Sequence, residues 1–100
     1  MAYSLQFHQE QVVPFIRDHP SLRRAQRVAI FAQLHGDLAV NAEHYLNDPK
    51  RRVVPGSSYF WYRAVARGPG DEVRIFRFAV NDEAARFGVL SLDYVDELKG

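Results

Sequence analysis

Cysteine is absent from this 100-residue sequence. Without cysteine the chain can form neither a disulfide framework nor a thiolate metal site, and its composition fits a reducing compartment. No apolar run approaches the ~20 residues of a transmembrane helix. The opening MAYSLQFHQEQ lacks the basic, apolar and small-residue sections of a signal peptide. We therefore expect a cytoplasmic protein without a membrane segment.

An excess of charge of one sign is also missing. The 13 Lys and Arg and the 12 Asp and Glu leave a net charge of +1, so a basic site has to come from local clustering. The histidines are too scattered for a metal-ligand motif: His8, His19, His35 and His44. No Gly-rich phosphate loop, Ser-His-Asp set or paired-carboxylate motif is present. We therefore expect neither a metal nor a cofactor.

Apolar residues are plentiful. Hydrophobic residues make up 47% of the chain and aromatic residues 13%, enough for one core in a single domain spanning 1–100. Residues 3–7 alternate between apolar and polar, which is the period of a half-buried strand. A short helix from His8 to Asp18, begun or kinked by Pro14, is expected to follow.

A longer helix is expected over residues 22–35, with Ser21 as its N-cap and Gly36 as the residue after its C-cap. The apolar spacing predicts its buried face: Leu22, Ala25, Val28, Ala29, Phe31, Ala32 and Leu34. The basic residues fall on the other side: Arg23, Arg24 and Arg27. A further helical piece is expected from Asp37 to Leu46.

The remainder predicts three strands, within SSYFWYRAVAR, VRIFRFAVND and ARFGVLSLDYV, separated by turns at GPGD and NDE. The expected architecture is an α+β domain with one N-terminal strand, two to three helices and then a three-stranded antiparallel meander. The helices are expected to pack on one face of an antiparallel sheet.

Alternation along the strands predicts a core row: Phe60, Tyr62, Ala64, Ala66, Phe76, Phe78, Val80, Leu90 and Leu92. Arg77 then emerges on the open face beside Arg63 and Trp61, since an unpaired buried arginine costs several kcal/mol. Arg74 falls in the core row near the strand entry, where it can reach outward. The open-face arginines either bind an anion or nucleic acid, or pair with a carboxylate such as Asp93.

The opening MAYSLQF, the basic helical middle, YFWYRAVA and EVRIFRFAVNDEAARFGVLSL make the chain similar, over nearly its full length, to the RelE/ParE superfamily of bacterial toxins. The resemblance implies the toxin component of a type II toxin–antitoxin system, held inactive by an antitoxin that wraps around it. RelE-like members cleave messenger RNA on the ribosome as metal-independent endoribonucleases, and ParE-like members act on DNA gyrase.

In ribonuclease members the arginine of the strand motif contacts the scissile phosphate, and by position the resemblance implies Arg74 for that role. It implies RNA contacts for Arg63 and places Trp61 at a second position that is often basic. RNA-cleaving members also carry basic residues after the last strand, whereas this chain has LDYVDELKG there. The candidate catalytic residues are Arg63, Arg74, Arg77 and Tyr94. The candidate substrate-binding residues are Lys50, Arg51, Arg52 and Trp61.

Three functions remain open. The first is a RelE-type ribonuclease, and the second is a ParE-like toxin that acts by binding a protein target. The third is a non-catalytic protein-interaction domain that keeps the RelE/ParE-like fold without toxin activity. The acidic C-terminal residues favour binding over cleavage. For the antitoxin, we expect a helix-in-groove or strand-addition complex with Tyr59 and Trp61 as anchors.

Overall fold

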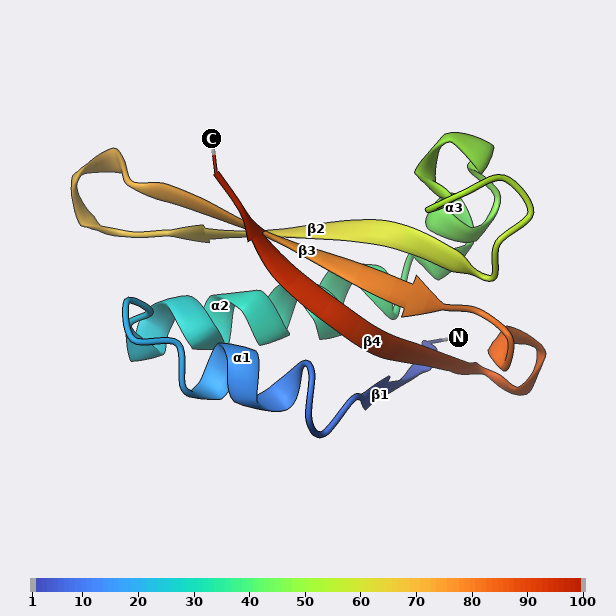
Figure 1. Cartoon of the computed structure of the whole chain (residues 1–100), viewed down its shortest axis with the longest axis horizontal. Coiled ribbons are helices and arrows are strands. Elements are labelled where there is room, and N and C mark those ends of the chain that lie inside the picture. Colours follow the sequence, from blue (N-terminus) through green and yellow to red (C-terminus); the bar gives the residue numbers. More distant parts are fainter. Residues whose placement is uncertain (1, 100) are drawn as a thin grey trace.

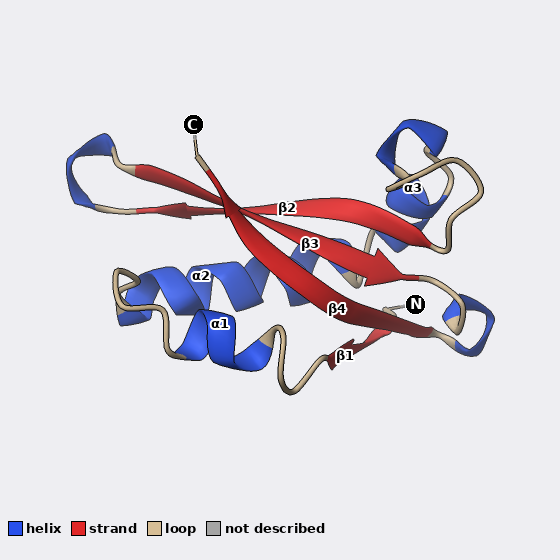
Figure 2. Ribbon diagram, viewed as in Figure 1, coloured by secondary structure: helices blue, strands red, loops and turns tan. Residues whose placement is uncertain are grey.

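The structure, a computed structural model, describes residues 2–99, so the two ends of the predicted 1–100 domain lie outside the described residues. Its α+β class is the one predicted. The elements are β1 (Ser4–Phe7), α1 (Val13–Arg17), α2 (Arg24–Gln33), a π-helical turn (Leu34–Leu38), α3 (Ala42–Leu46), β2 (Tyr59–Arg67), β3 (Val73–Asn81) and β4 (Val89–Leu98). Figures 1 and 2 show α1 and α2 on the same side of a twisted sheet, with α3 beside the start of β2. No helix within the described residues is both long enough and apolar enough to cross a membrane.

The four strands form one sheet in the order β1-β4-β3-β2. Strands β2, β3 and β4 pair antiparallel, whereas β1 pairs with β4 in parallel, with Leu5 opposite Leu90 and Phe7 opposite Leu92. The prediction of an antiparallel sheet is therefore wrong, because the sheet is mixed. The alternation of apolar and polar residues determines which face of a strand is buried. It does not determine which strand lies beside it, or whether the two run parallel or antiparallel. Strands β1 and β2 form the two open edges.

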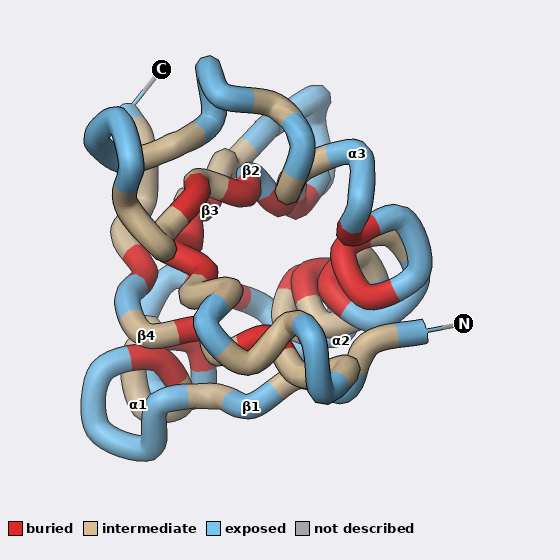
Figure 3. The backbone as a smooth tube through the Cα atoms, turned by 90° about the vertical axis from the view of Figure 1, so that its right-hand side faces the viewer, coloured by how far each residue is buried: buried red, intermediate tan, exposed pale blue. Residues whose placement is uncertain are grey.

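The core lies between the sheet and the helices, and Figure 3 shows buried segments of α2 facing those of β2 and β3. The core row predicted for the strands is confirmed: Phe60, Tyr62, Ala64, Ala66, Phe76, Phe78, Val80, Leu90 and Leu92 are all buried. Their faces follow from the two-residue period of a strand. The opposite face carries the alternate residues, including Trp61, Arg63 and Arg77.

A β-bulge interrupts the pairing of β3 with β4. Val80 pairs with Leu92 but the preceding Ala79 pairs with Tyr94, which leaves Asp93 as the extra residue of β4. One added residue reverses the faces of everything that follows it. Before the bulge the even-numbered residues of β4 are buried, and after it Val95 and Glu97 lie on the core side. The strand also continues to Leu98, so the acidic residues assigned to a tail belong to the sheet.

Two helix boundaries differ from the prediction. Helix α1 covers only Val13–Arg17 of the expected His8–Asp18, with Pro14 in its first turn, where a missing amide donor does no harm. Helix α2 begins at Arg24 and not after Ser21. Its expected end at Gly36 is also wrong, because the chain continues through a π-helical turn that contains Gly36.

The buried face predicted for α2 is correct at Leu22 and Leu34 but wrong at Ala25, Val28 and Ala32, which are exposed. The buried positions recur every four residues, at Leu22, Gln26, Ile30, Leu34 and Leu38, whereas Val28 is 60% exposed. The pattern was missed because a glutamine sits in the middle of this row. Gln26 is buried at the helix start, where its side-chain oxygen accepts a hydrogen bond from the backbone N–H of Arg23 at 2.9 Å. That bond satisfies one of the free donors at the helix N-terminus.

Candidate anion-binding site

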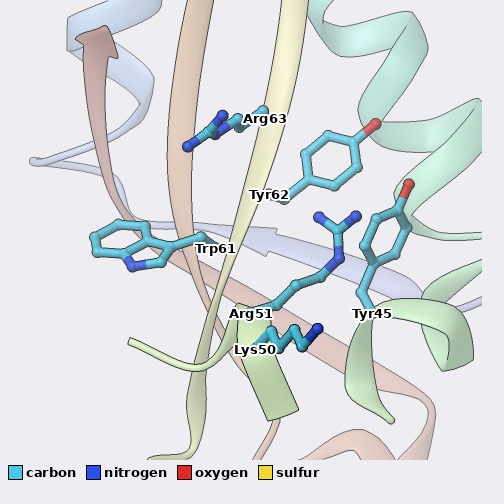
Figure 4. Close-up of a pocket in the computed structure, with 6 residues that line it drawn as sticks. All are labelled: Tyr45, Lys50, Arg51, Trp61, Tyr62 and Arg63. Carbon is cyan, nitrogen blue, oxygen red and sulfur yellow. The ribbon is translucent and has the colours of Figure 1, made fainter. Parts of the chain in front are cut away.

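A pocket of about 390 Å³ lies at the outer edge of β2, beside α3 and the loop that follows it. Six residues line it: Tyr45, Lys50, Arg51, Trp61, Tyr62 and Arg63. In Figure 4, Trp61 and Arg63 extend from one side of β2 and Tyr62 from the other. Because β2 is an edge strand, side chains from both of its faces can border one opening. We call these six residues the edge pocket.

Two cations of the edge pocket come from a short 3₁₀ turn, Pro49–Arg51. Asp48 begins this turn by accepting a hydrogen bond from the backbone N–H of Lys50 at 3.0 Å. Its other oxygen lies 3.4 Å from Nε of Arg51. The Arg51 guanidinium lies over the ring of Tyr45, 4.7 Å from the ring centroid, which adds a cation–π contact. The turn therefore presents Lys50 and Arg51 side by side to the pocket.

The third cation, Arg63, projects from the middle of β2 and is exposed. Among residues 2–99 its side chain makes no ion pair or hydrogen bond. A guanidinium without a protein carboxylate is free to bind an external anion in bidentate fashion. Two residues earlier on the same face, Trp61 supplies an aromatic wall. The edge pocket thus combines three cations with the partly exposed rings of Trp61 and Tyr45.

Asp37 lies behind the two tyrosines and holds both of them. One of its oxygens accepts hydrogen bonds from the hydroxyls of Tyr45 at 2.6 Å and Tyr62 at 2.9 Å, and its other oxygen accepts from Asn41 at 2.9 Å. Burial raises the pKa of Asp37, but the hydrogen bonds from Tyr45, Asn41 and Tyr62 outweigh it and the net shift is downward. Burial and then the bond to Asp37 raise the pKa of Tyr45 to about 12 and raise that of Tyr62 as well. Both tyrosines therefore remain protonated donors at neutral pH.

Gln33, the last residue of α2, forms hydrogen bonds with β2. The side-chain amide of Gln33 accepts a hydrogen bond from the backbone N–H of Val65 at 2.8 Å and donates one to the carbonyl of the same residue. Tyr62 also donates to the backbone carbonyl of Gln33 at 3.3 Å. Gln33 and Asp37 stand four residues apart, on either side of the start of the π-helical turn. Such turns recur at functional sites, and this one fixes the position of the pocket wall.

The structure brings four of the predicted site residues together, since Lys50, Arg51, Trp61 and Arg63 all line the edge pocket. It does not bring Arg52 to them. Arg52 pairs with Asp82 at 2.7 Å and donates to the carbonyl of Leu46 at 2.8 Å, which joins the loop before β2 to the end of β3. Arg52 therefore has a structural role in this loop.

Arg74, implied as the phosphate contact, does not reach the open face. It donates from Nε and Nη2 to the two oxygens of Glu97, each at 2.9 Å, and from Nη1 to the carbonyl of Ser21 at 2.8 Å. The bulge at Asp93 turns Glu97 to the helix side, where it supplies the carboxylate that Arg74 pairs with. Arg74 is thus satisfied within the protein.

Arg77 lies on the open face directly opposite Arg63, as the alternation predicted. It donates to both oxygens of Asp96, at 2.8 and 3.2 Å, and its guanidinium stacks 4.0 Å from the ring centroid of Trp61. Tyr94 contacts the edge of the same indole and donates weakly to Asp96 at 3.4 Å. Of the two open alternatives, pairing with a carboxylate holds for Arg77, although its partner is Asp96 and not Asp93.

Sequence reasoning missed the residues that shape the pocket from behind. Asp37 and Tyr45 were placed only within an expected helical piece and Tyr62 in the core row, and Gln33 was given no role. No local pattern connects these positions, since they meet only through packing of the π-helical turn against β2. Comparisons of the chain with protein-family models, with curated proteins and with solved structures each gave no match.

Proposed function

We propose that this chain is a RelE/ParE-like toxin of a bacterial type II toxin–antitoxin pair, and that it acts by binding a polyanionic target such as messenger RNA on the ribosome. The edge pocket carries this proposal, because it gathers Lys50, Arg51 and Arg63 around Trp61. Cations beside an accessible aromatic ring are groups that bind a nucleic-acid strand, and Trp61 is partly exposed here. The order of one strand, helices and a hairpin followed by a last strand agrees with the resemblance.

Binding is favoured over cleavage by the state of the other arginines. Metal-independent RNA cleavage needs a base, an acid and cations free to stabilise the phosphorane. Arg74 and Arg77 are each held by both oxygens of a carboxylate. The hydroxyls of Tyr45 and Tyr62 are committed to Asp37, and no histidine lines the edge pocket. The pocket therefore offers charge without an evident base.

The proposal includes an antitoxin partner and a cytoplasmic location, where messenger RNA and gyrase are found. Both outer strands, β1 and β2, have a free edge that an added strand can pair with. Along β2 the backbone of Val65 is already bonded to Gln33, and at the other end Arg52 bridges to Phe60, so little of this edge is left and β1 offers the longer free edge to an added strand. Tyr59 and Trp61 are half-buried side chains of β2 that can serve as anchors for a partner helix.

A second candidate function is a non-catalytic protein-interaction domain that keeps the fold and lacks toxicity. The same two ion pairs favour it, since they remove charge from the surface on which cleavage would depend. The two candidates differ in one observable, because a toxin arrests growth when produced without its antitoxin and an interaction domain does not. A ParE-like toxin would arrest growth by acting on gyrase, and its toxicity would not depend on binding messenger RNA.

The deciding experiment is controlled expression of the chain in a bacterial host, with growth and translation followed over time. We expect wild type to arrest growth and Arg63→Ala to relieve the arrest at equal protein level. Arg24→Ala is the matched control, because it removes an exposed arginine from α2, away from the edge pocket. Harmless wild-type protein would reject the toxin proposal, and arrest with intact translation and inhibited gyrase would redirect the target.

A further inference from the structure

The two outer strands of the sheet differ in how their free edges are protected from pairing with another chain. The edge of β2 is covered at both ends, by hydrogen bonds from Gln33 and by a bridge from Arg52. The strand also carries the exposed Arg63 and Arg67, and charges on an edge strand disfavour added strands. Strand β1 lies at the opposite margin (Figure 1), and residues 2–9, AYSLQFHQ, contain neither a charged residue nor proline. Only its short length protects β1.

The backbone of β1 has a few groups that point away from the sheet. The N–H groups of Ser4 and His8 donate to carbonyls on the β4 side, at 2.7 and 2.9 Å. Because alternate residues of a strand direct their backbone groups to opposite edges, Leu5 and Phe7 direct theirs away from β4. The N–H of Tyr3 is already bonded, at 2.8 Å, to the carbonyl that follows the π-helical turn. The free edge therefore consists of the N–H and carbonyl groups of Leu5 and Phe7.

An antiparallel second copy of β1 uses all of these groups at once. Leu5 then lies opposite Phe7 of the other copy, and Phe7 opposite its Leu5, as hydrogen-bonded pairs of an antiparallel ladder. Gln6 lies opposite Gln6 of the other copy, on the two-fold axis. The neighbouring registers use fewer groups, because Tyr3 is bonded elsewhere and the strand ends at Phe7. The Phe7 carbonyl also accepts from the side chain of Gln9 at 3.1 Å, but its second lone pair is free.

The side chains of β1 also suit this register. Leu5 and Phe7 are half-buried against the core, and the ring of Phe7 lies 5.6 Å from that of Phe31. In the paired strands they meet on the helix side, as an apolar cross-strand pair that extends both cores. Gln6 is exposed on the other face, where each amide can both donate to and accept from its copy.

Charged residues at the two ends of β1 are complementary between copies. The register brings Glu10 of one copy toward Ala2 of the other, and Ala2 lines one pocket together with Arg86. Glu10 and Arg86 are both exposed, and among residues 2–99 neither of them forms an ion pair. Glu43 lines the same pocket, so it offsets part of the attraction. The charges therefore assist the pairing but do not carry it.

We infer that two copies of this chain pair antiparallel through β1, with Gln6 on the two-fold axis, and so join two four-stranded sheets into one. The assembly is closed, because the protected β2 strands become its outer edges. The interface is small, and we expect a dissociation constant of about 10 to about 100 µM. This inference goes beyond the proposed function. A partner strand added at β1 and a second copy exclude each other.

Sedimentation equilibrium of the purified full-length chain, from about 5 to about 500 µM at low salt, measures the dimer. Gln6→Lys and Gln6→Glu each place like charges opposite one another on the axis, and we expect each to weaken the dimer at least about fivefold. An equimolar mixture of the two variants pairs opposite charges, so its affinity should return to within about threefold of wild type. Asn47→Lys is the matched control, because it changes the charge of an exposed residue at the end of α3 and should leave the dimer unchanged.

Three results would overturn the inference: a wild-type chain that stays monomeric throughout, a dimer insensitive to both Gln6 variants, or a mixture that pairs no better than either variant alone. Because Gln6 is exposed, both variants should keep the melting temperature of wild type, which excludes unfolding as the cause of a lost dimer. The proposed function fails separately. A dimeric but harmless protein rejects the toxin alone, and a monomeric protein that arrests growth rejects this inference alone.

Discussion

Arg74 and Glu97 form a bidentate pair across β3 and β4, with Nε and Nη2 of the arginine each 2.9 Å from a carboxylate oxygen. Their side chains are only 12% and 26% exposed, so the pair is largely shielded from water. Arg74 also donates to the carbonyl of Ser21, and Glu97 bonds to Nε2 of His19 at 3.0 Å. The pair therefore connects the far end of the sheet to the segment that precedes α2.

The first prediction follows from this position. Arg74→Ala leaves Glu97 without its main partner, and we expect it to lower the free energy of unfolding by about 1–3 kcal/mol. Chemical denaturation of wild type and variant measures the difference. Arg63→Ala serves as the control, with an expected change within about 0.5 kcal/mol because its side chain is exposed. Equal stability of wild type and Arg74→Ala would contradict a structural role and restore Arg74 as a candidate functional residue.

The second prediction concerns acid. The hydrogen bond from Arg74 holds the pKa of Glu97 below its ordinary value of 4.5, despite an opposing effect of burial. A depressed folded-state pKa stabilises the protein above the unfolded-state pKa, and this contribution is lost as pH falls through the folded-state pKa. We expect wild type to be more stable than Glu97→Gln near neutral pH. The difference should shrink below about pH 4.5.

Unfolding free energies of both proteins, measured between about pH 7 and about pH 2, provide the test. Asp18→Asn is a useful comparison because Asp18, the residue after α1, pairs with Arg17 in similar geometry but with both side chains exposed. Parallel curves for wild type and Glu97→Gln across the whole range would show that Glu97 contributes no linked stability.

The faces of β2 and β3 could be predicted from the sequence, because a strand buries every second residue and Phe60, Phe76 and Phe78 make the pattern clear. The ion-pair partner of Arg74 could not be predicted from the sequence. It depends on a single extra residue at Asp93, and nothing in the local sequence separates an inserted residue from one more step of the strand. The acidic end of β4 was recognised as unusual, but its use as the counter-charge for β3 follows only from the register.

The candidate site was predictable in its chemistry and not in its assembly. The sequence identified the cations and the aromatic residue of the site as candidates, namely Lys50, Arg51, Trp61 and Arg63. Their convergence required β2 to be an edge strand with the preceding turn packed beside it. The same limit applies to α2, where the buried Gln26 broke the apolar spacing that a sequence reading depends on.

The third prediction tests the wall of the edge pocket. Burial and the bond to Asp37 raise the pKa of Tyr45 to about 12, and the same causes raise the pKa of Tyr62. A raised folded-state pKa stabilises the protein below the ordinary value of 10.0, and this contribution is lost as pH rises through the folded-state value. We expect Asp37→Asn to lower both values toward 10.0, because the charge that disfavours a phenolate is gone.

The ultraviolet absorbance of phenolate, followed through an alkaline titration, measures this change. Tyr45→Phe identifies the transition that belongs to Tyr45, since it removes one of the five tyrosines in the chain. A late transition that survives unchanged in Asp37→Asn would show that burial alone holds the tyrosines protonated. The fixed orientation of the pocket wall would then need another cause.

The fourth prediction uses the pair of Arg77 and Asp96 on the open face. Arg77 stacks on Trp61 while both oxygens of Asp96 hold its guanidinium, so its charge is masked beside the edge pocket. We expect Asp96→Asn to strengthen binding of a single-stranded oligonucleotide by about threefold to tenfold at low salt. The salt slope should steepen by about 0.7, because one more cation can neutralise a phosphate. Fluorescence titration at several salt concentrations measures both quantities.

Asp18→Asn is the matched control for this prediction, since it also frees an arginine from a bidentate carboxylate and raises the net charge by the same amount. Asp18 directly follows α1, which lies on the helix side of the sheet, whereas Trp61 is on the opposite face. An equal gain in both variants would mean that affinity follows overall charge and not position. No gain in Asp96→Asn would mean that Arg77 faces away from the bound strand, which would confine binding to Lys50, Arg51 and Arg63. A gain limited to Asp96→Asn makes the open face beside Trp61 a continuation of the binding surface, because only there does an unmasked guanidinium meet the ligand.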